Sequence, residues 1–179
     1  MGARMENIAS NADTTKRMVV YHFKSKESLY MLVLEHVYRC LRQHELELDL
    51  SAYPPAEAIV KLVEASFDFH VSHPEFIRIV STENMLRGRF IRQSTSIRQL
   101  NQTALTVLDE ILERGKKSHL FKEDAQARDV HRLISSLCVH QVANQYTFGA
   151  LFEDPDEFDT QTAHYRQLAV MVALRYLMI

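Results

Sequence analysis

Five basic side chains near the N-terminus could contact a polyanion such as DNA. Residues 1–26 carry a net charge of +3, so the rest of the 179-residue chain carries −5 of the total of −2. The basic residues of this segment are Arg4, Lys16, Arg17, Lys24 and Lys26. A small basic head on an acidic body is the charge asymmetry expected when only the head approaches a nucleic acid.

A second group of candidate residues lies between residues 55 and 148, where polar side chains alternate with aromatic ones on the inward faces of predicted helices. A mostly apolar cavity with a few convergent polar groups is the usual form of a small-molecule site. The alternative, which the sequence leaves open, is that each polar residue is a satisfied buried group or faces water. The candidates are Phe67, His70, Phe76, Glu83, Asn84, Gln141 and Asn144.

Arrangements typical of catalysis or metal binding are not found in the sequence. It contains no Gly-rich phosphate loop, nucleophile elbow or zinc-ligand spacing, so we predict neither an enzyme nor a cofactor. His70 and His73 share a helix, but Pro74 distorts the turn and no acidic or thiol partner keeps ligand spacing, so we predict no metal site. Cys40 and Cys138 lie in apolar helical stretches and are interpreted as reduced core thiols.

The candidate residues must be positioned by helices. Four Gly and four Pro are few for a β-rich fold, and long stretches rich in Leu, Ala, Glu and Arg favour an all-α class. No apolar run is long enough to cross a bilayer and no signal peptide is found, so we expect a cytoplasmic protein without a membrane partner. Apolar periodicity predicts helices over residues 4–12, 16–22, 25–48, 55–72, 75–87, 97–115, 124–148 and 159–178.

Local signals predict where several of these helices begin and end. Thr15 and Ser25 are predicted N-caps, and Gly115 is a predicted C-cap. Asn and Asp in the turn over 11–14 tolerate a left-handed backbone. Asp-Pro-Asp at 154–156 marks a loop.

The helix predicted over 25–48 would be about 36 Å long, and could belong to a head and a body at once. Its residues keep one face over four turns. The predicted inward face consists of Leu29, Leu32, Val33, His36, Val37, Cys40, Leu41 and His44.

Two short helices joined by a tight turn, the second beginning with a capped basic segment, form a helix-turn-helix pattern. The small Ala9 would let the two helices cross closely. The segment IASNADTTKRMVVYHFKSKESLY resembles the signature of the tetracycline-repressor (TetR) family, and the resemblance covers residues 4–30. It consists of an Ile-Ala pair, a turn, a short recognition helix ending in aromatic residues, and Ser-Lys-Glu-x-Leu-Tyr opening a long helix. The resemblance implies a DNA-binding head over 1–30 and a ligand-binding and dimerisation body over 31–179.

The resemblance also implies roles for individual residues. The positions that correspond to the base-reading face of the family are Thr15, Lys16, Arg17 and Met18. The positions that correspond to phosphate contacts are Tyr21, His22, Lys26 and, at the groove edge, Arg4. The sequence departs from the usual pattern at Asp13, where Gly is common, at Thr14, where an apolar residue is common, and at Val20, where Tyr is frequent. The first helix of the family has no counterpart in this sequence, so we expect a head that is incomplete on its N-terminal side.

As a member of this family, the protein would be a ligand-responsive transcriptional regulator, a repressor that binds a palindromic operator as a homodimer. A small-molecule effector would release it by shifting the helix over 25–48 and changing the spacing of the two heads. The helices over 124–148 and 159–178 carry apolar residues on more than one face, which predicts that they form the dimer interface. The alternative is a helical small-molecule carrier or interaction module without DNA binding.

Overall fold

The computed structural model describes residues 3–152 and 158–179, which form nine α-helices and two 3₁₀ helices. The predicted loop at 154–156 lies outside the described residues. The all-α prediction is confirmed, since extended backbone in the described ranges pairs only in an isolated bridge between Phe121 and Met178. The helices are α1 (Met5–Asn11), α2 (Lys16–Phe23), α3 (Lys26–Leu46), η1 (Leu50–Ala52), α4 (Pro55–Ser72), α5 (Pro74–Met85), η2 (Ile91–Gln93), α6 (Thr95–Lys117), α7 (Ala127–Ala143), α8 (Gln145–Phe152) and α9 (Phe158–Leu177).

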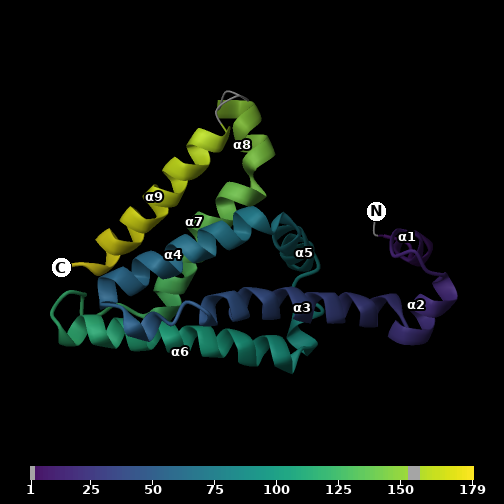
Figure 1. Ribbon diagram of the computed structural model, residues 1–179, viewed down its shortest axis with the longest axis horizontal. Coiled ribbons are helices and arrows are strands. Elements are labelled where there is room, and N and C mark those ends of the chain that lie inside the picture. The colour runs from purple at the N-terminus through teal and green to yellow at the C-terminus, as the bar shows by residue number, and fades with distance from the viewer. Residues whose placement is uncertain (1–2, 153–157) are drawn as a thin grey trace.

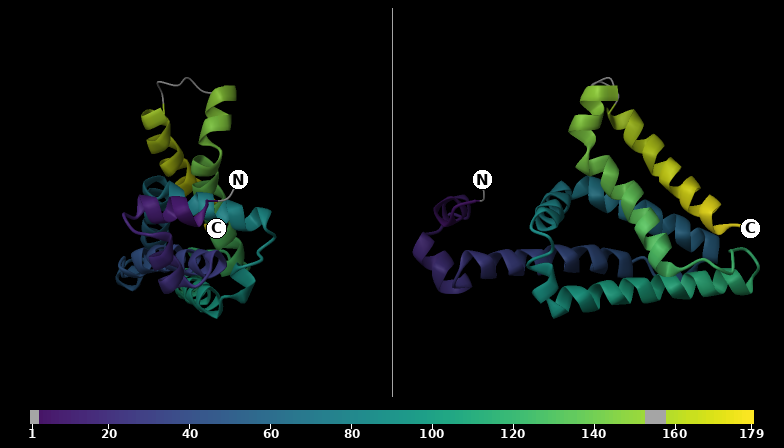
Figure 2. Two further views of the ribbon diagram at one scale, coloured as in Figure 1. Left: turned by 90° about the vertical axis from the view of Figure 1, so that its right-hand side faces the viewer. Right: turned by 180° about the vertical axis from the view of Figure 1, so that it is seen from behind.

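The molecule is a small head held away from a larger body by one long helix (Figure 1). Helices α1 and α2 form the head at the N-terminal end of α3, and α3 continues into the body, where it runs beside α6. Helix α4 crosses the body between α7 and α9, and α8 turns the chain at the end of the body from which α9 returns (Figure 2). Helix α3 runs through the head boundary predicted at residue 30, so one continuous helix belongs to both the head and the body.

The ends of the head helices follow the local signals in the sequence. The Thr15 Oγ1 accepts a hydrogen bond from the Met18 N–H at 3.2 Å, and the Ser25 Oγ accepts one from the Ser28 N–H at 3.0 Å. Both predicted N-caps are therefore confirmed. Asp13, in the turn between α1 and α2, has a φ of 47°, the left-handed conformation expected there.

Two helix predictions are wrong in part. The helix predicted over 124–148 is divided at Asn144, whose N–H donates to the His140 carbonyl at 3.0 Å and whose side chain also bonds that carbonyl, ending α7. On α3, Leu32 and Val33 are exposed, whereas Leu34 is fully buried. Helices α4, α5 and α6 pack against α3, and the residues of α3 that are buried are Leu34, Leu41 and Arg42.

Gly115 does not end its helix, contrary to the prediction, because α6 continues to Lys117 and is capped at Ser118. Gly115 is buried, and the ring of Phe121 lies directly against it. A Cβ at position 115 would stand 1.9 Å from the Phe121 Cδ2 atom. Glycine is therefore required here by a close approach of a buried ring rather than by a helix end.

We expect Gly115→Ala to lower the free energy of unfolding by about 2 kcal/mol, because the new methyl group overlaps a fully buried ring. Helix propensity alone would favour the substitution by about 1 kcal/mol, so the sign of the effect separates the two explanations. Urea unfolding monitored by circular dichroism measures it. Phe121→Leu should relieve part of the defect in the double variant, and a stabilised Gly115→Ala protein would contradict this packing.

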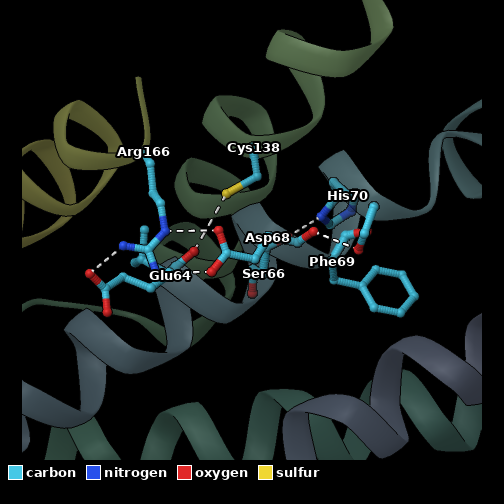
Figure 3. Close-up of polar contacts among 9 residues, drawn as sticks. Glu64, Ser66, Asp68, Phe69, His70, Cys138 and Arg166 are labelled. Atoms are coloured by element: carbon cyan, nitrogen blue, oxygen red, sulfur yellow. Dashed lines mark hydrogen bonds and ion pairs between the residues drawn. The ribbon is translucent and has the colours of Figure 1, made fainter. Parts of the chain in front are cut away.

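Helix α4 is tied to α7 and α9 by polar contacts at the edge of the main core (Figure 3). The Arg166 guanidinium of α9 donates to both Asp68 carboxylate oxygens at 2.8 and 2.9 Å, and to the Glu64 carboxylate at 2.7 Å. Cys138 of α7 lies against the Val63 carbonyl, and burial raises the pKa of its thiol to about 12. Cys138 is therefore a protonated core thiol, as predicted, and both cysteines are free.

Candidate DNA-binding head and effector cavity

The head presents the predicted DNA-reading residues on one exposed helix. Ala9 of α1 and Val19 of α2 are buried between the two helices, which fixes α2 against α1. Arg17 and His22 of α2 are exposed, and Tyr21 is 67% exposed. An exposed helix of this length with a basic N-terminal turn can enter a major groove.

The structure gives two of the predicted base-reading residues additional contacts. The Thr15 hydroxyl is the N-cap of α2 and accepts the Met18 N–H, so its proton and one lone pair are left for contacts with DNA. The Lys16 ammonium donates to the Glu6 carboxylate at 2.6 Å, and this contact lowers the pKa of Glu6. Because both side chains of the pair are more than half exposed, phosphate can compete with Glu6 for Lys16. Arg17, in the same first turn, is exposed as well.

The candidate phosphate contacts lie around the C-terminal end of α2 and the start of α3. Lys24 has a φ of 66°, and its ammonium donates to the Tyr21 carbonyl at 2.8 Å while lying near the Tyr21 ring. Lys26 is exposed in the first turn of α3, next to the Ser25 cap. Arg4 is exposed at the N-terminal end of α1. These positions surround the reading helix with groups that can bind phosphate.

A cavity of about 210 Å³ lies inside the body, between α3, α4, α5, α6 and α7. Two of the predicted ligand residues, His70 and Phe76, line it. Its wall is otherwise apolar except for Ser66 of α4 and a group of polar side chains on three other helices. These polar residues are Tyr38, Arg42 and Glu45 of α3, Asn101 of α6, and His131 and Ser135 of α7.

Arg42 is the centre of the polar group and is almost fully buried. Its guanidinium forms an ion pair with Glu45 and donates to the Asn101 Oδ1 at 3.0 Å. Burial raises the pKa of Glu45, and the charge of Arg42 opposes this shift. A larger open groove of about 670 Å³ lies between the end of α3 and α6. Four residues, Arg42, Glu45, Leu62 and Ala104, line both hollows and so stand between the inner cavity and the outer groove.

The two cavity histidines are uncharged at neutral pH. Burial lowers the pKa of His70, and the neighbouring charge of Arg42 lowers it further. Burial, followed by Arg42 and His70, lowers the pKa of His131 to about 4. The His70 Nδ1–H donates to the Ser66 carbonyl at 2.5 Å, which leaves Nε2 as an acceptor on a ring that lines the cavity (Figure 3).

The low pKa of His131 predicts a pH-dependent stability. The unfolded chain takes up a proton near pH 6.5 and folded His131 only near pH 4, so the free energy of unfolding should fall as the pH drops through this interval. Allowing for partial solvent access, the loss should be about 2 kcal/mol. Urea unfolding at pH 7 and pH 4.5 measures it. The variant His131→Gln should lose most of this pH dependence, whereas the control His164→Gln, which changes an exposed histidine, should keep it. An equal change in the free energy of unfolding between the two pH values for the wild type and both variants would contradict the burial of His131.

The other predicted ligand residues lie outside the cavity. Phe67 is fully buried in the main core with Leu108 and Val130. Asn84 is exposed, and its side-chain amide bonds the Val80 carbonyl of its own helix. The structure places Gln141 and Asn144 together in a separate hollow of about 230 Å³ between α7, α8 and α9.

Glu83 joins the N-terminal part of α3 to the segment before α6 instead of lining the cavity. It is buried, and its Oε1 accepts the N–H groups of Phe90 and Ile91 at 2.6 and 3.0 Å. Its Oε2 accepts the Tyr30 hydroxyl at 3.2 Å, and burial beside this carboxylate raises the pKa of Tyr30 to about 12. The Tyr30 and Phe90 rings also meet edge to face at 4.9 Å. Glu83 therefore holds the part of α3 that carries the head.

Sequence reasoning missed Arg42, Asn101 and His131 as cavity residues. A signal for the first was present, because Tyr38, Arg42 and Glu45 recur at i, i+4 and i+7 and so share one face of α3. The arrival of Asn101 and His131 at the same place depends on how α6 and α7 pack, which no local pattern encodes.

Comparison with known proteins agrees with this architecture. Residues 55–172 match the family described as "Tetracyclin repressor-like, C-terminal domain". The chain is 38% identical over 149 residues to the HTH-type transcriptional repressor NicS of Pseudomonas putida. The aligned region covers 83% of this chain and 70% of NicS.

Solved structures show the same fold at low sequence identity. The ketosteroid transcriptional regulator KstR2 of Mycobacterium tuberculosis superposes with a TM-score of 0.70 at 20% identity, covering 99% of this chain and 85% of KstR2. The transcriptional regulator FadR of Bacillus subtilis, solved in complex with stearoyl-CoA, superposes with a TM-score of 0.63 at 17% identity. The match covers 94% of this chain and 87% of FadR. With a helix-turn-helix head, a helical body and these matches, the chain belongs to the TetR family of transcriptional regulators.

Proposed function

We propose that this protein represses transcription by binding a palindromic operator as a homodimer, and that a small molecule in the cavity beside Arg42 releases it. The observation that carries the proposal is the exposed basic turn of α2 at the end of a helix, α3, that also forms one wall of the cavity. A ligand that displaces Arg42 or Glu45 would move the same helix that positions the head. The proposed place of action is the cytoplasm, where the operator would be.

The dimer interface that we propose is the surface of α8 and α9. Leu151 and Phe152 are 73% and 72% exposed, and Tyr146 is similarly exposed on the same short helix. Exposed apolar side chains gathered in this way mark a protein interface. Helix α8 lies on the opposite side of the body from α6, and two copies joined there would each present a head to DNA (Figure 1). Two heads must reach half-sites about 34 Å apart.

Leu151→Asp should convert the dimer to a monomer, because it buries a charge at the proposed interface. Sedimentation equilibrium measures the mass directly. The matched control is Leu32→Asp, which changes an exposed leucine of α3, away from α8 and α9, and should leave the dimer intact. A Leu151→Asp protein that remains dimeric would place the interface elsewhere.

Retention of promoter DNA tests the proposed repressor. The purified protein should bind the promoter region of its own gene with an affinity that falls steeply as salt rises, because several phosphates are neutralised. Fluorescence anisotropy with a labelled fragment measures both the affinity and its dependence on salt concentration. If the dimer retains no genomic fragment at low salt, the helical carrier without DNA binding becomes the better description.

A further inference from the structure

One buried hydrogen-bond donor of Arg42 has no partner among the residues that the structure describes. The two terminal nitrogens contact Glu45, Asn101 and the Nε2 atom of His131, whereas the Nε–H bonds no described group. Arg42 is only 6% exposed and lines the inner cavity. Buried polar groups in native proteins are nearly always bonded to protein or to ordered water, so this donor beside the cavity indicates where an acceptor can bind.

The cavity is balanced in charge before any ligand enters it. Arg42 and Glu45 form an ion pair whose side chains are 7% and 14% exposed. The other titratable groups on the wall are Tyr38, His70 and His131, and all three are uncharged at neutral pH, since burial raises the pKa of Tyr38 and lowers those of the two histidines. A charged ligand would leave one uncompensated charge in a buried site, which is strongly unfavourable.

The size and wall of the cavity suit one aromatic ring with a single polar group. Its volume of about 210 Å³ exceeds the roughly 150 Å³ of an apolar cavity that takes up benzene. The Phe76 ring meets the rings of Tyr38 and His70 edge to face, both at 5.4 Å between centroids. Aromatic walls of this kind favour another ring in contact with them.

We propose that the ligand of this cavity is a small, uncharged aromatic compound whose carbonyl-type oxygen accepts the Arg42 Nε–H. The inference rests on the proposed role of the cavity as the effector site and names the chemical class of the effector. The Nε2 lone pair of His70 can accept an N–H or O–H group of the same compound, since the ring proton is held on Nδ1. Arg42 thus recognises the polar group, and Glu45 determines which charge the cavity accepts.

Three compounds of nearly one shape and different charge test the proposal. Benzamide, benzoate and benzamidinium are titrated into the wild-type protein at pH 7.5, and binding is measured by chemical-shift changes in NMR spectra. We expect benzamide to bind at least about tenfold more tightly than either charged compound, because only it leaves the buried charges balanced. Binding of benzoate or benzamidinium as tight as that of benzamide, or no binding by any of the three, would overturn the proposal.

A variant that changes only the charge of the wall provides the second test. Glu45→Gln keeps an amide oxygen for Arg42 but leaves the cavity with one positive charge, so the preference should shift from benzamide to benzoate by about tenfold. Glu47→Gln removes an exposed carboxylate at the end of α3, outside the cavity, and should keep the wild-type preference. If Glu45→Gln fails to fold, the order of affinities of the three compounds for the wild-type protein decides whether the proposal holds. An unchanged preference in a folded Glu45→Gln protein would overturn the proposal.

Measuring DNA binding in the same samples separates this inference from the proposed function. If benzamide binds selectively and no compound ever releases promoter DNA, the chemistry of the cavity stands and its role as effector site fails. If only a charged compound occupies the cavity and releases DNA, the repressor mechanism stands and the assignment of an uncharged ligand fails.

Discussion

Arg17→Ala is expected to reduce the preference of the protein for its operator over unrelated DNA by about fivefold to 150-fold. This is the loss of about 1–3 kcal/mol expected when an arginine that binds a base edge is removed. Arg17 is exposed in the first turn of α2 and is not the cap of that helix, so its removal should leave the head folded. Anisotropy titrations with operator and scrambled fragments at the same salt concentration give the ratio directly.

Lys26→Ala is the matched control for Arg17→Ala. Lys26 lies in the first turn of α3, at a position that corresponds to a phosphate contact in the family. Its loss should therefore weaken binding to the operator and to scrambled DNA by similar factors. The slope of log affinity against log salt should fall by about one unit. If Arg17→Ala also weakens both fragments equally, α2 does not read bases through Arg17.

Glu83→Ala is expected to lower the free energy of unfolding by about 3 kcal/mol. The substitution leaves the buried N–H groups of Phe90 and Ile91 without their acceptor and removes the partner of the Tyr30 hydroxyl. Because these bonds hold α3 close to the head, we also expect weaker operator binding. Chemical unfolding and anisotropy measure the two effects.

Two variants calibrate the role of Glu83. Tyr30→Phe removes only one of the three bonds and should cost about 1 kcal/mol. Asn84→Ala changes the next residue, which is exposed and bonded only to its own helix, and should change stability by less than about 0.5 kcal/mol. Similar losses for Glu83→Ala and Asn84→Ala would mean that Glu83 does not join these segments.

The head could be predicted from the sequence because its geometry is set by neighbouring residues. The N-caps at Thr15 and Ser25 and the left-handed turn at Asp13 each depend on contacts within a few positions. The exposed basic face follows once Ala9 and Val19 are packed together. The same local signals also gave the bounds of α4 to within a residue.

The body could be predicted only in outline, because its site depends on contacts between distant helices. The sequence predicts Glu83 as a ligand residue because it is a polar residue among aromatic ones on an inward helix face. The partners that it bonds are instead Tyr30, 53 positions away, and Phe90 and Ile91 in the following loop. Gly115 resembled a helix end because the approach of the Phe121 ring cannot be read from composition. His70 and Phe76 were found because aromatic and polar residues alternate on their helices, whereas Arg42 was missed.

Dimethyl sulfate interference on the promoter fragment tests the reading helix most directly, since the reagent methylates guanine N7 in the major groove and adenine N3 in the minor groove. If α2 lies in the major groove, methylated guanines should block binding in two half-sites centred about 34 Å apart, and methylated adenines should have little effect. Interference confined to adenine N3, or none at any position in a fragment that the protein retains, would contradict the account.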